Sequence, residues 1–330
     1  MGENFYIFKS GRLQRKDNNV EIVSSEGEKK NLKIEMLEAI YLFGEMDLNT
    51  KVLNFLAQNK VLIHFFNYYG FYTGSFMPAE KNVSGYLLVH QVEHYTDLKK
   101  RMNLAKKVLH SGSKNILRNL NYYQRREIEI KEVVSKIERL IEQLDTCKGI
   151  QELMGVEGNI RKEYYSAWQD IFRDEVEFEK RVKRPPDNMV NSLISYINSL
   201  LYTTILAEIY KTQLNPTISF LHEPSTQRFS LALDISEIFK PLIVDRLIFS
   251  LINKKQITEK HFEEGSNCVY LTEVARKIVL QEYSNRLEQT IKHKDLKREV
   301  SYRYLIRLEC YKLIKHLIGE KEYEGFHIWW

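Results

Sequence analysis

The sequence predicts an α+β protein in which a mostly β domain, residues 1–82, precedes a larger α-helical domain, residues 83–330. Short apolar runs separated by turn signals fill the chain up to Pro78, as expected for closely spaced strands. From about Ser84 onward, apolar residues recur at helical spacing over long segments. With 330 residues, 43% of them hydrophobic, the chain can bury a sizeable core in one or two domains.

The N-terminal part predicts a series of strands with one helix. Ser10-Gly11 indicates a hairpin between Asn4–Lys9 and Arg12–Lys16. Thr50–Gln58 has a helical pattern with Asn49 or Thr50 as its cap. The other predicted strands are Val20–Val23, Lys29–Ile34, Ala39–Phe43, Val61–Phe66 and Phe71–Met77.

The rest of the chain predicts helices throughout. One segment, Ser192–Tyr210, is apolar enough to raise the question of a membrane span. Its polar residues, Asn198 and Glu208 among them, would be costly in lipid, so we expect a buried central helix and no membrane. The predicted helices are Tyr86–His110, Lys114–Arg126, Ile128–Asp145, Gly158–Phe172, Asn188–Thr212, Ser236–Ile252, Leu271–Gln281 and Lys297–Ile318.

The cysteines and the N-terminal sequence indicate the cellular compartment. Its three cysteines lie far apart and show no zinc-ligand spacing, and an odd count argues against a disulfide framework. The N-terminus has no basic region followed by an apolar run, so it does not predict a signal peptide. We therefore expect a cytoplasmic protein.

Basic charge gathers between Tyr95 and Arg126. This segment holds nine Lys or Arg residues and one acid, Asp97, for a net charge of +8. Many cations with few competing anions are what binding to a phosphate backbone requires, and Tyr122-Tyr123 adds aromatic faces that could stack on an unpaired base. The alternative is a solvated basic face paired with the acidic segment 127–142. On this charge, Lys99, Lys106 and Arg118 are predicted to contact nucleic acid.

Four polar residues in the middle of the chain are candidates for a metal site: Glu157, His222, Asp234 and Glu237. Carboxylates and an imidazole can hold a divalent cation and leave coordination positions open for a phosphate. Each residue also has an ordinary explanation, because acids near helix starts stabilise the helix dipole and a lone histidine is usually structural. The β-like run 228–234 could place a buried acidic pair beside His222, but spacing alone leaves convergence open.

The chain contains four motif segments: Met154–Gly158, Arg184–Ser195, Asn215–Pro224 and Arg228–Pro241. Together they resemble a known family, the CRISPR-associated integrase, which is the first of the two universal CRISPR adaptation proteins. The resemblance covers essentially the whole chain and is closest to the form that accompanies type I-B systems. At Lys240 many members have Arg, so the charge is kept but bidentate phosphate recognition is lost.

The resemblance implies that Glu157, His222 and Glu237 are ligands of Mg²⁺ or Mn²⁺, with Asp234 as a catalytic helper or a fourth ligand. Arg228 matches a motif position and joins the predicted DNA contacts. The implied enzyme is a homodimer that cuts double-stranded and branched DNA and inserts short foreign fragments as new spacers into the CRISPR array. Its implied partner is the second, smaller universal adaptation protein. The alternatives are a non-catalytic DNA-binding scaffold and a structural RNA-binding protein.

Overall fold

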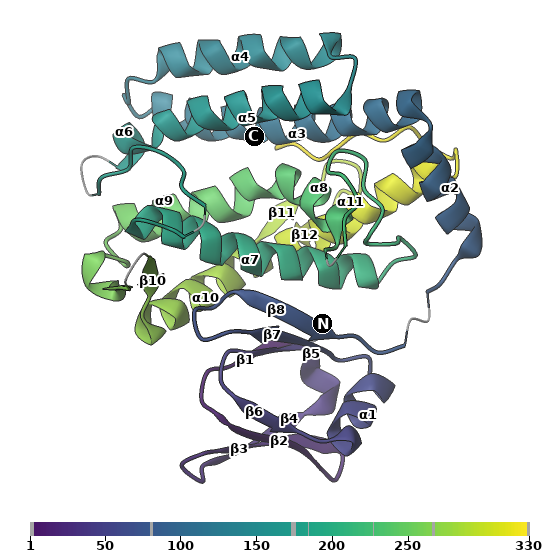
Figure 1. Cartoon of the computed structure of the whole chain (residues 1–330), viewed down its shortest axis with the longest axis vertical. Helices are drawn as coiled ribbons and strands as arrows, with labels where there is room; N and C mark the ends of the chain where they lie inside the picture. The colour runs from purple at the N-terminus through teal and green to yellow at the C-terminus, as the bar shows by residue number, and fades with distance from the viewer. Residues whose placement is uncertain are drawn as a thin grey trace. The chain divides into compact units, whose positions relative to one another are not determined.

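The computed structural model describes residues 3–79, 82–172, 176–183, 185–226, 228–265 and 268–328 (Figure 1). Arg184 of the second matched segment lies outside these ranges. The chain divides into two compact units, Met1–Val83 and Ser84–Trp330. Unit 1 is built mainly of strands and unit 2 mainly of helices. The predicted α+β fold class is confirmed.

The described residues of unit 1 form two four-stranded sheets, one α-helix and one short 3₁₀ helix. In the order β1-β5-β7-β8, the first sheet is parallel except for the antiparallel pair of β7 and β8. The second, in the order β4-β3-β2-β6, is antiparallel except for the parallel pair of β2 and β6. The elements are β1 (Glu3–Ile7), β2 (Gly11–Lys16), β3 (Asn19–Ser24), β4 (Lys29–Lys33), η1 (Ile34–Met36), β5 (Leu37–Leu42), β6 (Met46–Leu48), α1 (Thr50–Gln58), β7 (Leu62–Phe66) and β8 (Tyr72–Phe76).

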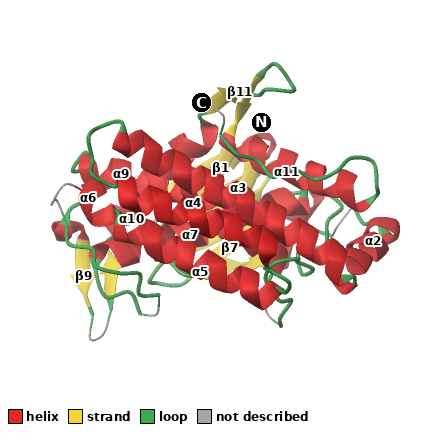
Figure 2. Cartoon of the chain, turned by 90° about the horizontal axis from the view of Figure 1, so that it is seen from above, coloured by secondary structure: helices red, strands yellow, loops and turns green. Residues whose placement is uncertain are grey.

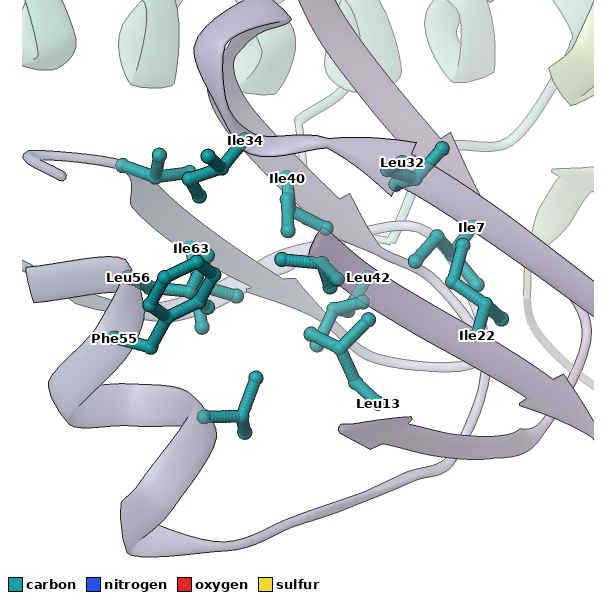
Figure 3. Close-up of a cluster of buried hydrophobic side chains, with 13 residues drawn as sticks. Ile7, Leu13, Ile22, Leu32, Ile34, Ile40, Leu42, Phe55, Leu56 and Ile63 are labelled. Carbon is teal, nitrogen blue, oxygen red and sulfur yellow. The ribbon is translucent and has the colours of Figure 1, made fainter. Parts of the chain in front are cut away.

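The core of unit 1 brings side chains of both sheets together with one face of α1 (Figure 3). Leu13 of β2, Ile40 of β5 and Ile63 of β7 are fully buried there. Phe55 and Leu56 of α1 pack into the same cluster. Asn49 caps this helix, because its side chain accepts a hydrogen bond from the Val52 backbone N–H at 3.0 Å. The predicted helix is confirmed, and of the two predicted caps, Asn49 and Thr50, the structure selects Asn49.

The hairpin predicted around Ser10-Gly11 is wrong. The strand before it, β1, pairs with β5, whereas β2 pairs with β3 in the other sheet. Gly11 lies where the chain passes between the sheets, and a Cβ atom there would stand 2.1 Å from the carbonyl oxygen of Val23. Glycine is thus required by a close backbone approach and not by a hairpin turn. The true hairpin joins β2 to β3, and Asp17 in its turn has a φ of 53°.

Unit 2 is predominantly helical, and the strands that the structure describes in it are only three residues long (Figure 2). Helix α3 contacts α4, α5 and α8, and α7 contacts α8, α9 and α11. The elements are α2 (Gly85–Thr96), α3 (Leu98–Gln124), α4 (Lys131–Thr146), α5 (Ile150–Ser166), α6 (Trp168–Phe172), α7 (Met189–Tyr210), α8 (Ser230–Phe239), η2 (Lys240–Asp245), α9 (Arg246–Asn253), η3 (Glu259–His261), β9 (Phe262–Glu264), β10 (Val269–Leu271), α10 (Glu273–Glu288), β11 (Thr290–Lys292), β12 (Glu299–Ser301) and α11 (Tyr302–Leu317).

The predicted single helix Tyr86–His110 is wrong, because the chain breaks at Asp97. The Asp97 side chain accepts hydrogen bonds from the backbone N–H groups of Lys99 at 2.9 Å and Lys100 at 3.0 Å. It thereby caps α3, which then continues without interruption to Gln124. The basic segment identified in the sequence is therefore mostly one long helix.

The β-like run 228–234 is also not a strand. Helix α8 begins at Ser230, and its apolar residues are buried on almost every side. A helix that is buried on all sides does not show apolar residues at three- and four-residue spacing along one face. The periodicity of the sequence therefore could not distinguish a buried helix from a buried strand here. After α8 the backbone widens into the π-helical turn η2, which contains Pro241.

Helix α7 is the one described helix that is long and apolar enough to cross a membrane by length and composition, and 78% of its apolar window is buried inside the protein. A core helix passes the same test. Its burial agrees with the central helix predicted for Ser192–Tyr210.

Candidate active site

Three structural elements of unit 2 carry the four candidate site residues. Glu157 lies in the middle of α5, so the expectation that it lies near a helix start is wrong. Asp234 and Glu237 both lie on α8, and His222 lies in the segment between α7 and α8. Helix α3 packs against both α5 and α8. Its Gly112 allows this approach, since a Cβ atom there would stand 2.7 Å from the backbone oxygen of Glu237.

Arg161 joins Glu157 to Glu237. Its Nε atom lies 3.3 Å from an oxygen of Glu157, one helical turn earlier on α5. One of its terminal nitrogens lies 2.6 Å from an oxygen of Glu237 on α8. The two carboxylates, far apart in sequence, therefore share one guanidinium group.

Glu237 is buried among positive charges. Its second oxygen contacts the ammonium group of Lys240, one turn further along the chain. Burial by itself would raise the pKa of this carboxyl, but the charges of Lys240, Arg161 and His222 outweigh it and hold the pKa of Glu237 far below its usual range. The carboxylate is therefore ionised at any physiological pH, as a metal ligand must be.

Asp234 orients His222. One carboxylate oxygen accepts the backbone N–H of His222 and lies 2.9 Å from the ring atom Nδ1. The other oxygen accepts the backbone N–H groups of Phe220 at 2.6 Å and Leu221 at 3.0 Å. Because a carboxylate accepts and does not donate, the proton of the neutral His222 ring sits on Nδ1, and Nε2 carries the lone pair. This is how a carboxylate behind a ligating histidine usually orients it.

A second buried carboxylate, Asp245, stands behind Arg161. Its oxygen lies 4.0 Å from the remaining terminal nitrogen of Arg161. Burial raises the pKa of Asp245 to about 7, although Arg161, Tyr164 and Lys240 act in the opposite direction. Sequence reasoning missed Arg161 and Asp245. The spacing of four between Glu157 and Arg161 was the one available signal for the first of them.

The sequence matches the family model described as CRISPR associated protein Cas1 over residues 5–285. It is 56% identical over 330 residues to the CRISPR-associated endonuclease Cas1 of Fusobacterium nucleatum, covering 100% of this chain and 98% of that protein. The chain belongs to the Cas1 family. The resemblance inferred from the four motifs is confirmed.

Solved structures agree with this membership. A Cas1 protein from Thermotoga maritima is 41% identical and matches 98% of this Cas1 chain and 100% of its own, with a TM-score of 0.89. A casposase matches 98% of this chain and 93% of its own with a TM-score of 0.87. At 22% identity the casposase shows a shared fold.

The side chains at the Cas1 site are of the types that bind a divalent metal ion. Two carboxylates and one imidazole are suitable ligands for Mn²⁺, and the carboxylates can also bind Mg²⁺. Within the described ranges, however, no three acidic, histidine or cysteine side chains are grouped so as to hold an ion as they stand. Arg161 and Lys240 contact the two oxygens of Glu237, and Arg161 also contacts one oxygen of Glu157. Asp234 spends both oxygens on four donors, which fits the helper role better than that of a fourth ligand.

The four predicted DNA contacts of this Cas1 chain do not form one cluster of free cations. Lys99 is exposed near the start of α3. Lys106 donates to the carbonyl oxygen of Asp145 at 2.7 Å, and Arg228 donates to that of Glu223 at 2.6 Å. Arg118 lines a cavity at the far end of α3. Arg228, six residues after His222, is the one nearest to the site in sequence.

Proposed function

We propose that this Cas1 protein is a CRISPR adaptation integrase, a metal-dependent DNA endonuclease and strand-transfer enzyme that inserts short foreign DNA fragments as new spacers into the CRISPR array. The observation that carries this proposal is the joining of Glu157 and Glu237 through Arg161, with His222 close enough to act on the charge of Glu237. Carboxylates and an oriented imidazole are the groups that phosphodiester chemistry on a metal requires.

Glu157, His222 and Glu237 would hold the Mg²⁺ or Mn²⁺ ion. When bound, the ion would supply Lewis acidity toward a phosphate oxygen. Asp234 keeps the Nε2 lone pair of His222 available by fixing the proton on Nδ1. An ion on Glu237 would compete with the cationic side chains that now neutralise this carboxylate.

Arg161 and Lys240 would act on the DNA itself. Both cations contact the carboxylate of Glu237. A DNA phosphate bound beside Glu237 would therefore lie close to two positive charges. In a buried site, fixed positive groups stabilise charge that develops on a phosphate more strongly than they would in water. Released from the carboxylates, either side chain could hold a phosphate oxygen while a hydroxyl attacks. That hydroxyl belongs to water in cleavage and to a DNA 3′ end in strand transfer. In both cases the attacked phosphodiester loses one P–O bond, and the departing sugar oxygen gains a proton as the attacking hydroxyl loses one.

The working assembly would be a homodimer joined to the smaller universal adaptation protein, acting on double-stranded and branched DNA in the cytoplasm. Two solved relatives of this fold support the assignment by analogy, namely the casposase, which is bound to its integration product, and a chain in a Cas6-RT-Cas1–Cas2 complex. The three cysteines are free thiols, as a reducing compartment favours.

The experiment compares Glu157→Gln and His222→Ala with the parent on branched DNA in the presence of Mn²⁺. We expect either substitution to reduce cleavage and strand transfer at least a hundredfold, because each removes one ligand of the same ion. The matched control is Glu163→Gln, on the same helix, whose carboxylate lies 3.7 Å from Lys136 on α4. Variants that cut as fast as the parent would support the rival hypothesis, a DNA-binding scaffold without catalysis.

A further inference from the structure

Two buried polar atoms face each other behind the candidate active site without forming a hydrogen bond. The Nη1 atom of Arg161, which contacts neither glutamate, stands 4.0 Å from the Oδ2 atom of Asp245. Neither atom has a hydrogen-bond partner among the described residues, and both are shielded from solvent. Buried polar atoms are almost always paired, because an unmade hydrogen bond in the interior is costly. The two atoms are therefore an incomplete pair.

This pair can be completed by a small motion of the side chains. Arg161 reaches the gap from α5, and Asp245 reaches it from the last residue of η2. A hydrogen bond between a guanidinium and a carboxylate spans about 2.7–2.9 Å, so an approach of about 1 Å would form it. Asp245 is thus an acceptor that stands ready for Arg161.

Arg161 needs such an acceptor once the two glutamates bind a metal ion. At present it pairs with one oxygen of Glu157 and one of Glu237, and its side chain is only 13% exposed. A buried guanidinium that loses its counter-ions is strongly destabilised. Among the described residues, Asp245 is the remaining carboxylate within 4.0 Å of Arg161. It is therefore the group to which Arg161 can turn.

The charge of Asp245 suits this exchange. Burial raises the pKa of Asp245 to about 7, so near neutral pH the carboxyl is poised between its neutral and ionised forms. Added positive charge at the glutamates and a closer guanidinium would both favour the ionised form. The titratable and charged groups that face Asp245 are Arg161, Tyr164 and Tyr165 of α5, Glu237 of α8 and Lys240 at the start of η2.

We propose that Asp245 is a positioning residue that takes Arg161 over from Glu157 and Glu237 when these glutamates bind the metal ion. This inference rests on the metal site of the proposed function. In the exchanged position Nη1 of Arg161 pairs with Asp245, which leaves Nε and Nη2 available for a phosphate oxygen of the DNA. Asp245 thereby keeps a cation beside the reacting phosphate. The competing possibility is that Lys240, whose side chain is 23% exposed, leaves Glu237 while Arg161 stays.

The first test measures Mn²⁺ affinity by calorimetry at about pH 8 in the parent, Asp245→Asn, Arg161→Met and the double variant. Asparagine keeps the shape of Asp245 without its charge, so we expect Asp245→Asn to weaken Mn²⁺ binding about tenfold. Without the guanidinium there is nothing to take over, so in the Arg161→Met background the same substitution should change the affinity less than about twofold. Equal losses in both backgrounds, or no loss in either, would overturn the inference.

The pH dependence separates this role from a merely structural one. Loss of the His222 proton tightens Mn²⁺ binding with rising pH in the parent and in Asp245→Asn alike, so the ratio of their affinities isolates Asp245. We expect a ratio near one at about pH 5, where Asp245 is protonated, and about ten at about pH 8, where it is ionised. A ratio that does not change with pH would contradict the exchange.

The matched control is Glu208→Gln. It removes another buried carboxylate from an arginine, since Glu208 of α7 lies 2.6 Å from Nε of Arg307 on α11. This pair shares no residue with the candidate active site. The variant should bind Mn²⁺ with the affinity of the parent at both pH values.

A crystal structure of the parent grown with Mn²⁺ gives a readout that does not depend on how the variants fold. We expect Nη1 of Arg161 to lie within about 3 Å of Oδ2 of Asp245, with Arg161 no longer hydrogen-bonded to Glu237. A bound ion with Arg161 still on Glu237 and Lys240 displaced would overturn the inference.

The inference and the proposed function can fail separately. A parent protein that binds no Mn²⁺ at Glu157, His222 and Glu237 refutes the proposed metal site, and the role of Asp245 with it. A parent that binds Mn²⁺ and cuts DNA, but whose Mn²⁺ affinity is insensitive to Asp245→Asn, refutes the role of Asp245 alone.

Discussion

The Asp234 carboxylate accepts the Nδ1 proton of His222 at 2.9 Å while it also holds the backbone N–H groups of residues 220–222. One buried side chain thus fixes both the loop and the orientation of the imidazole it carries. Asp234 thus positions His222, one of the three proposed metal ligands.

Replacing this carboxylate should weaken metal binding without removing a ligand. Asp234→Asn places an NH₂ group where three backbone donors and the ring converge, so we expect Mn²⁺ affinity to fall about 10- to 100-fold. The hydrogen bond and charge of Asp234 outweigh burial and raise the pKa of His222, so this pKa should fall in the variant. Calorimetry with Mn²⁺ and an NMR titration of the ring measure the two effects.

The control for this substitution is Asp145→Asn, which breaks an exposed contact of 2.8 Å with His110. It should leave Mn²⁺ binding unchanged. An Asp234→Asn protein with the parent's affinity and the parent's His222 pKa would show that the carboxylate does not orient the ring.

Gly112 should be irreplaceable at the crossing of α3 and α8. In Gly112→Ala the new methyl group would stand 2.7 Å from the backbone oxygen of Glu237, so the two helices must separate. We expect a loss of about 1–3 kcal/mol in the free energy of unfolding, and reduced cleavage because Glu237 moves. Chemical denaturation and a cleavage assay measure both.

Gly158→Ala is the matched control. Gly158 lies inside α5, and nothing stands within 4 Å of the position its Cβ would take. Alanine is the better helix former, so this variant should gain about 0.5–1 kcal/mol. If both substitutions had the same effect, close packing at Gly112 would not be the cause.

Asp245 should make the protein less stable as pH rises from about 4 to about 7. In the folded protein its pKa is about 7, whereas in the unfolded chain it is about 3.9. Between these values the folded state binds the extra proton, so the free energy of unfolding falls with rising pH, by at most about 4 kcal/mol. Asp245→Asn cannot ionise and should lack this fall. Denaturation at about pH 5 and about pH 8 tests it.

The control is Asp170→Asn, which removes an exposed carboxyl on α6. It should follow the pH dependence of the parent. If Asp245→Asn also loses stability in parallel with the parent, the raised pKa of Asp245 is refuted.

The C-terminal segment should support α8. Phe326 is buried and stacks on Phe239 of α8 with the ring centres 6.1 Å apart, and Asn115 of α3 donates to the backbone oxygens of both Ile238 and Phe326. We expect Phe326→Ala to cost about 3–5 kcal/mol of unfolding free energy. The neighbouring His327 is exposed, so His327→Ala should cost less than about 0.5 kcal/mol. Equal losses would refute the packing role.

Local pattern was sufficient for much of this protein. Turn signals located the described strands of unit 1 except β6, and a cap at Asn49 or Thr50 marked the start of α1. Helical spacing marked the long helices. These features could be predicted because they depend on neighbouring residues. The motif order across the chain identified the family, which the comparisons confirm.

The tertiary structure decided what depends on residues distant in sequence. Only packing shows that Ser10-Gly11 passes between two sheets, that the β-like run 228–234 is the buried helix α8, and that Arg161 links Glu157 to Glu237. It also shows that Arg118 faces a cavity with Lys254, whereas Lys106 is held by Asp145. Spacing along a chain reports which face a side chain occupies, but which faces meet is set by how the helices bury their apolar surfaces together.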